Sequence, residues 1–146
     1  KNSLDPLKSF AKIYFETTDY QDIGQEFVLS THFNGGFMNR AMSQFEKFRL
    51  GGMNSFPGYK KDALWGKLYF VFGLESRFPI INDLYFRSKL MGGGIWESID
   101  HVNWNVLRIG GRLGISIPTP LGPIILDYGL SKSKKPIFYF SFGHRF

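Results

Sequence analysis

The chain has 146 residues, a net charge of +6 and no cysteine, and Phe, Tyr and Trp make up 18% of it. Its length fits one domain, and the lack of cysteine excludes disulfides and thiolate metal sites. No stretch approaches the roughly 20 consecutive apolar residues of a membrane helix, so a helical membrane protein is excluded. The basic residues are dispersed rather than gathered into a stripe, so nucleic acid is not an expected partner.

Alternation of apolar and polar residues predicts eight β-strands in chain order. Residues 1–8 are expected to be a lead-in; they contain no apolar signal core, so an exported chain with this start would be a mature chain or a fragment, and we favour a fragment. The first two strands are predicted at 9–19 and 25–33. A third lies somewhere within 37–50, where the alternation is weak. The remaining five are predicted at 65–78, 84–91, 105–117, 124–130 and 136–146.

The strand at 65–78 shows the pattern most clearly. Phe70 and Phe72 fall on one face, while Tyr69, Glu75 and Arg77 fall on the other. Its length far exceeds the usual 5–6 residues of a soluble strand and satisfies the roughly 9–11 residues of a membrane strand. The predicted fold class is therefore all-β: an antiparallel transmembrane β-barrel occupying 1–146 as a single domain. A soluble β-barrel that binds an apolar ligand is the alternative with the same alternation.

The predicted connections alternate between two kinds. Residues 77–83 and 118–123 form compact turns with proline, whereas 51–63, 92–104 and 131–135 are longer and polar or rich in glycine. Outer-membrane barrels have short periplasmic turns and longer external loops. The three longer links are therefore expected outside the cell.

Charged residues on the polar faces are candidates for a lumen network. The main candidates are Glu75, Arg77, Arg108, Arg112 and Asp127, and the wider set of lumen-facing charges adds Lys12, Glu16, Glu26, Lys67, Arg87, Lys89 and Arg145. An eight-stranded barrel has an interior just wide enough for side chains, which favours an internal ion-pair network over a polar conduit.

Enzymatic chemistry is not expected in this chain. It contains no Gly-x-Ser-x-Gly nucleophile motif, and Asp127 has no nucleophile with which to pair. His32, His101 and His144 lack the spacing of metal ligands. We therefore predict no catalytic residue, no metal and no cofactor.

Four ordered segments resemble the BamA-type, or bacterial surface antigen, superfamily. They read Leu-Gly-Gly-Met-Asn-Ser-Phe-Pro-Gly-Tyr at 50–59, Gly-Leu-Glu-Ser-Arg-Phe-Pro-Ile at 73–80, Thr-Pro-Leu-Gly-Pro-Ile-Ile-Leu-Asp-Tyr-Gly at 119–129 and Phe-Ser-Phe-Gly-His-Arg-Phe at 140–146. The resemblance implies that 51–63 is an external loop folded inward, with the motif Gly51, Gly52, Pro57, Gly58 and Tyr59. It also implies a C-terminal insertion signal, read by the outer-membrane assembly machinery, at Phe138, Phe140, Phe142 and Phe146.

The resemblance also implies a position within a larger barrel. In a sixteen-stranded member the inward loop joins the eleventh and twelfth strands. Three predicted strands precede the loop here and five follow it, so the chain corresponds to the last eight strands. Either upstream strands or a second copy of the chain would complete such a ring, unless the chain is a small barrel by itself.

Two departures from the family pattern bear on function. Pro57 stands where the family usually has an arginine, and Lys89-Leu90-Met91-Gly92 replaces the usual Asp-x-Gly. The Pro-Gly-Tyr form resembles the barrel of patatin-like phospholipase autotransporters, which implies a membrane anchor or translocator. The alternative is an assembly or secretion pore. The resemblance implies location in a bacterial outer membrane, with lipids including lipopolysaccharide as partners.

Overall fold

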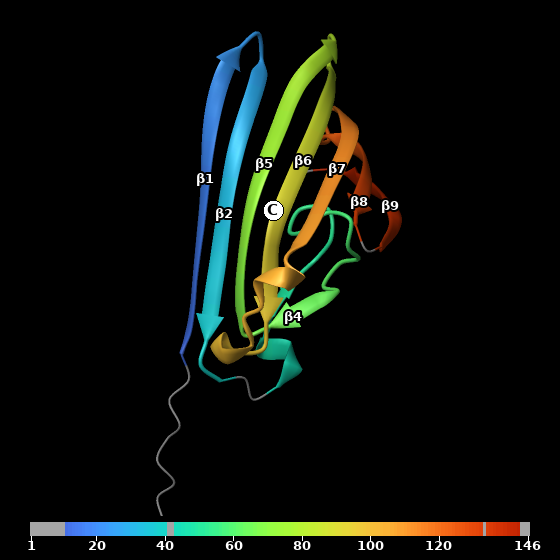
Figure 1. Ribbon diagram of the computed structural model, residues 1–146. Helices are drawn as coiled ribbons and strands as arrows, with labels where there is room; N and C mark the ends of the chain where they lie inside the picture. The colour runs from blue at the N-terminus through green and yellow to red at the C-terminus, as the bar shows by residue number, and fades with distance from the viewer. Residues whose placement is uncertain (1–10, 41–42, 133, 144–146) are drawn as a thin grey trace, which may run out of the picture.

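One antiparallel sheet of seven strands dominates the computed structural model, which describes residues 11–40, 43–132 and 134–143. The strands lie in the order β1-β2-β5-β6-β7-β8-β9. Each strand of this sheet therefore pairs with the sheet strands that come before and after it in the sequence. The sheet curls around the segment that links β2 to β5 (Figure 1). The strands are β1 (Lys12–Gly24), β2 (Phe27–Met38), β5 (Leu68–Ile81), β6 (Leu84–Trp96), β7 (Arg108–Ile117), β8 (Ile124–Ser131) and β9 (Lys134–Phe142).

The smaller elements lie in the two long links. The strands β3 (Phe48–Leu50) and β4 (Leu64–Gly66) form a separate two-stranded sheet within the link between β2 and β5. Three single-turn 3-10 helices complete the set: η1 (Gln44–Glu46), η2 (Ile99–His101) and η3 (Trp104–Val106). Across the described residues, no helix has the length and apolar character needed to cross a membrane.

The strand predicted within 37–50 is not part of the main sheet. Instead β2 continues through Gly35 and Gly36 to Met38, and 48–50 forms only the short β3. The two glycines belong in the strand because aromatic rings occupy their side-chain positions: a Cβ on Gly35 would meet the Phe15 ring, and one on Gly36 would meet the Phe48 ring. Two strands of the main sheet, rather than three, therefore precede the inward loop, and by the resemblance the described strands correspond to the last seven of sixteen.

The turn predicted at 77–83 is also shorter than expected. β5 runs through Pro79 to Ile81, and only Asn82 and Asp83 separate it from β6. Pro79 lies beside an irregularity in the register with β6. A strand tolerates proline at such a bulge because the ladder there lacks the hydrogen bond that proline cannot donate.

The two faces of the sheet differ in chemistry. The convex face carries exposed apolar side chains along its strands, including Phe72, Leu90, Ile109, Phe138 and Phe140. The concave face carries charged side chains, including Glu75, Arg87, Lys89, Arg112 and Asp127. An apolar outer face and a polar inner face alternate along transmembrane barrel strands. A soluble barrel would place its apolar face inside, so the observed orientation opposes that alternative.

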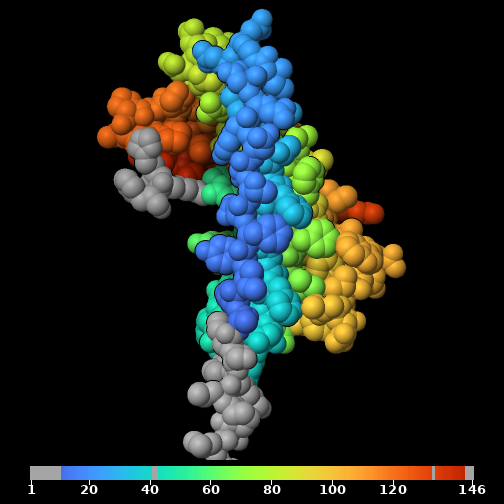
Figure 2. Space-filling view, turned by 90° about the vertical axis from the view of Figure 1, so that its left-hand side faces the viewer, coloured from blue at the N-terminus to red at the C-terminus, as the bar shows by residue number. Residues whose placement is uncertain are grey.

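The sheet is open in the described part of the chain. β1 pairs only with β2, and β9 pairs only with β8, so each has one unpaired edge among the described residues. Figure 2 shows β1 as a long edge that runs the height of the molecule. Unpaired edges expose backbone hydrogen-bonding groups that a membrane cannot satisfy, so a complete barrel requires further strands.

Candidate functional site

The segment 51–59 lies on the concave face of the sheet. Phe56 and Tyr59 are buried there in one cluster with Val71 of β5 and with Met91 and Ile95 of β6. Their rings meet edge to face, with centroids 5.4 Å apart. Because this cluster supplies the hydrophobic core of the described chain, the loop and the sheet stabilise each other.

Hydrogen bonds within the loop fix its path. The Gly52 amide donates to the Tyr59 carbonyl at 2.9 Å, and the Phe56 amide donates to the Gly52 carbonyl at 3.2 Å. Gly52 has a φ of 91°, in the left-handed region that favours glycine. The loop therefore closes on itself before it contacts the strands.

The tip of the loop touches the sheet backbone directly. A Cβ on Gly58 would collide with the carbonyl of Leu130 in β8, and a Cβ on Gly110 in β7 would collide with the carbonyl of Pro57. Gly58 also has a φ of 84°. Glycine on both sides of the contact thus lets two backbones approach closely.

Tyr139 of β9 attaches the same tip to the edge strand. Its hydroxyl donates to the Tyr59 carbonyl at 2.8 Å and accepts from the Gly58 amide at 3.2 Å. A Cβ on Gly129, in β8, would meet the Tyr139 ring. The loop therefore connects the core of the sheet at β5 and β6 to its last strand.

The Tyr139→Phe variant should weaken loop attachment by about 1–3 kcal/mol, because it leaves the Gly58 amide and the Tyr59 carbonyl without their shared partner. Urea unfolding in detergent micelles measures the loss. Tyr128→Phe is the matched control, since Tyr128 belongs to β8 and is exposed on the convex face. Equal stability of the two variants would contradict the role of the hydroxyl.

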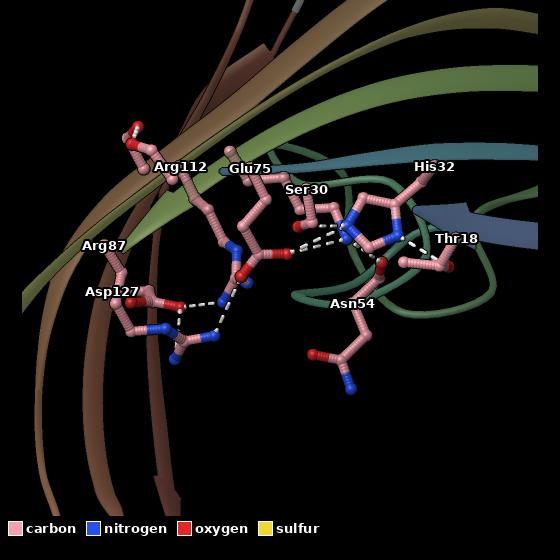
Figure 3. A network of polar contacts seen from close by, with 11 residues as sticks. Thr18, Ser30, His32, Asn54, Glu75, Arg87, Arg112 and Asp127 are labelled. Atoms are coloured by element: carbon pink, nitrogen blue, oxygen red, sulfur yellow. Dashed lines mark hydrogen bonds and ion pairs between the residues drawn. The ribbon is translucent and has the colours of Figure 1, made fainter. Parts of the chain in front are cut away.

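An ion-pair network lies beside the loop, and Glu75 of β5 is at its centre (Figure 3). The Glu75 carboxylate pairs with Arg112 at 2.6 Å, Lys89 at 3.2 Å and Arg87 at 3.3 Å. The partners come from β6 and β7, which follow β5 in the sheet. One carboxylate cannot neutralise three partly buried cations, so a second anion is needed nearby.

Asp127 of β8 supplies that second anion. Its carboxylate pairs with Arg112 and lies 3.7 Å from Arg87. Asp127 is 1% exposed and stands directly opposite Gly114 of β7. A Cβ on Gly114 would collide with the Asp127 carboxylate, so the glycine makes room for the buried anion.

Two further contacts extend the network. The Lys89 ammonium donates to the Asn54 carbonyl of the loop at 3.4 Å. His32 of β2 lies 3.4 Å from Glu75 and also contacts the hydroxyls of Thr18 and Ser30, at 3.1 and 3.2 Å. The network therefore spans β1 to β8 and reaches the loop (Figure 3).

The predicted lumen residues separate into two groups. Glu75, Arg112 and Asp127 meet in the network. Arg77 instead lies over the Tyr85 ring, 5.1 Å from its centroid, and the structure gives neither Arg77 nor Arg108 an ion pair within the described part of the chain. Both lie on the concave face, where Arg77 is opposite Arg87 and Arg108 is opposite Gly93.

Arg87 and Lys89 belong to the wider set of charged residues that the alternation predicts on the lumen face, and both pair with Glu75. His32 was not among the predicted network residues. His32 shares the polar face of β2, and its approach to Glu75 follows from the pairing of β2 with β5.

The aromatic residues of the C-terminal strand face away from this site. Phe138, Phe140 and Phe142 are exposed on the convex side of β9. Phe146 lies outside the described residues. The role of these four residues as an insertion signal stays a prediction.

Comparison with known proteins places the chain in a family. The Omp85 superfamily domain matches residues 5–146. Outer envelope protein 80 of Arabidopsis thaliana, a chloroplast protein, is 30% identical over 121 residues, which are 77% of this chain and 16% of the relative.

The solved structure of BamA from Haemophilus ducreyi, which lacks POTRA domains 1–3, is similar in fold. It has a TM-score of 0.71 and 13% sequence identity, and the match covers 90% of this chain and 34% of that one. At this identity the likeness establishes the fold alone, and it confirms the predicted outer-membrane β-barrel. The chain spans well under half the length of either relative.

Proposed function

Because the chain belongs to the Omp85 superfamily of outer-membrane β-barrels, we propose that it is the membrane-embedded part of a protein that inserts or translocates other proteins. The chain is an outer-membrane protein by its family and fold. The proposal extends this assignment to an activity of the longer protein.

The inward loop is the observation that carries the proposal. A barrel that served only as an anchor would need its strands and a filled interior. Here a loop with a buried aromatic core is held to the last strand by the hydroxyl of Tyr139. That strand has an unpaired edge among the described residues, and an edge is where a further strand adds to a sheet.

By itself, the motif Pro57, Gly58 and Tyr59 favours a patatin-like autotransporter barrel. The similarity to outer envelope protein 80 and to BamA gives that assignment no support. The assembly or translocation function, which was the alternative, agrees better with these relatives. Lys89 also offers a local replacement for the missing family arginine, because it joins Glu75 to the loop carbonyl of Asn54.

A reconstitution experiment tests the proposal. The full-length protein is placed in liposomes, and a urea-unfolded small outer-membrane barrel is added as the client. We expect the client to become protease-protected and heat-modifiable faster than in empty liposomes. The Gly110→Ala variant should reduce this acceleration because it displaces Pro57.

The matched control is Gly92→Ala, a strand glycine whose added Cβ would find its nearest neighbour, the Arg108 carbonyl, 3.9 Å away. It should accelerate client folding as the wild type does. Client folding at the rate of empty liposomes with correctly folded wild-type protein would refute the proposal. Release of fatty acids from the liposomes would instead favour the patatin-like alternative.

A further inference from the structure

A groove crosses the convex, lipid-facing side of β5, β6, β7 and β8. Its volume is about 610 Å³. Its apolar walls are formed by Leu74, Leu90, Ile109, Leu113 and Leu130. These five side chains are exposed in the described structure, so nothing in the described chain covers the groove.

Small residues create the depression between these walls. Gly111 of β7 contributes no side chain, and Ser76 of β5 and Ser88 of β6 contribute short ones. The two serine hydroxyls hydrogen-bond to each other at 2.7 Å. Because the two hydroxyls are partners in this hydrogen bond, they are less costly to expose to a lipid chain than two isolated hydroxyls would be.

A cation lines the same groove. Lys132, in the turn between β8 and β9, is one of its lining residues and is exposed. Lys134 and Lys135 follow within three positions, and no acidic residue occurs after Asp127 in the sequence. Asp127 itself is committed to Arg112 on the opposite face of the sheet. The turn therefore carries positive charge with no neighbouring acid from its own hairpin.

We propose that this groove binds one acyl chain of a phosphate-bearing membrane lipid, and that Lys132 holds the lipid phosphate. The apolar walls would contact the methylene groups of the acyl chain, and burial of each methylene group is favourable. The ammonium would attract the phosphate, and this attraction is worth most near the membrane surface. The site is on the outside of the barrel, so it is independent of the inward loop and of the proposed activity.

Native mass spectrometry of the full-length protein in mild detergent tests the site. Two probes with identical acyl chains are added: phosphatidylglycerol, which has a phosphate, and diacylglycerol, which lacks one. We expect one phosphatidylglycerol molecule to be retained in preference to diacylglycerol. Lys132→Gln should lower phosphatidylglycerol retention about five-fold, the effect of one cation near an anionic lipid surface.

Ser88→Leu separates the groove from the charge, because an apolar side chain on the convex face fills the depression while remaining compatible with lipid. This variant should reduce retention of both probes. Lys60→Gln, at an exposed lysine of the inward loop that does not line the groove, should behave as the wild type. Heat-modifiable gel mobility verifies that each variant is folded.

Three results would overturn the proposal. Equal retention of the two probes by the wild type would show that the phosphate does not contribute to binding. Unchanged binding by Ser88→Leu would show that the lipid does not occupy the groove. Displacement of the lipid by inorganic phosphate alone would assign Lys132 to free phosphate. The liposome assay of client folding is unaffected by any of these outcomes, so failure here is distinguishable from failure of the proposed function.

Discussion

The Asp127→Asn variant should lose about 3–5 kcal/mol of unfolding free energy, the usual cost of removing one partner from a buried ion pair. Asparagine keeps the volume of aspartate but removes the charge. Arg112, whose side chain is 2% exposed, would then share Glu75 with Arg87 and Lys89. Three cations around a single carboxylate in a water-poor site repel one another, and this repulsion is the physical source of the loss.

Urea unfolding in detergent micelles measures the effect, with Glu97→Gln as the control. Glu97 pairs with Lys47 at 2.9 Å, but its side chain is 55% exposed, so its loss should cost below about 1 kcal/mol. The double variant Asp127→Leu with Arg112→Met removes both members of the pair and should be more stable than Asp127→Asn alone. Similar losses for Asp127→Asn and Glu97→Gln would show that the network is not a stabilising unit.

Alternation in the sequence predicted which side of each strand faces inward. Glu75, Arg112 and Asp127 were placed on the polar face, and the structure brings all three together. The alternation is informative because the convex face meets lipid and the concave face meets the polar interior. A shift of one residue in the register would move every side chain of a strand to the wrong face.

The partners within the network were less predictable. Arg77 and Arg108 share the polar face with Glu75, yet the ion pairs go to Arg87 and Lys89 of β6. The choice depends on the register of four neighbouring strands, which no local pattern determines. It also depends on Gly114, whose missing side chain leaves room for Asp127.

Strand ends were predicted poorly for a related reason. Local sequence predicts a strand end at Gly35 and Gly36, because glycine weakens strands and favours turns. In the folded chain they lie inside β2, where the rings of Phe15 and Phe48 use the space that side chains would fill. Those rings come from segments distant in sequence, so the glycines acquire their role only through tertiary contact.

The Gly58→Ala variant should release the inward loop from the sheet while the strands remain paired. The added Cβ would collide with the Leu130 carbonyl, and the φ of 84° is unfavourable for alanine. The left-handed conformation alone costs about 1–2 kcal/mol, and every 1.4 kcal/mol is a factor of ten in an equilibrium. The fraction of molecules with a detached loop should therefore rise at least about ten-fold.

Chymotrypsin reports this detachment at the Tyr59–Lys60 bond, because Tyr59 is buried when the loop is in place. Brief digestion of the folded protein, followed by mass spectrometry, gives the cleavage rate at this bond. Gly110→Ala should raise the same rate, since it disrupts the contact from the strand side at the Pro57 carbonyl, whereas Gly92→Ala should leave it unchanged. If Gly58→Ala resisted cleavage as well as Gly92→Ala does, the close backbone contact would not hold the loop, and the aromatic cluster around Phe56 would have to do so alone.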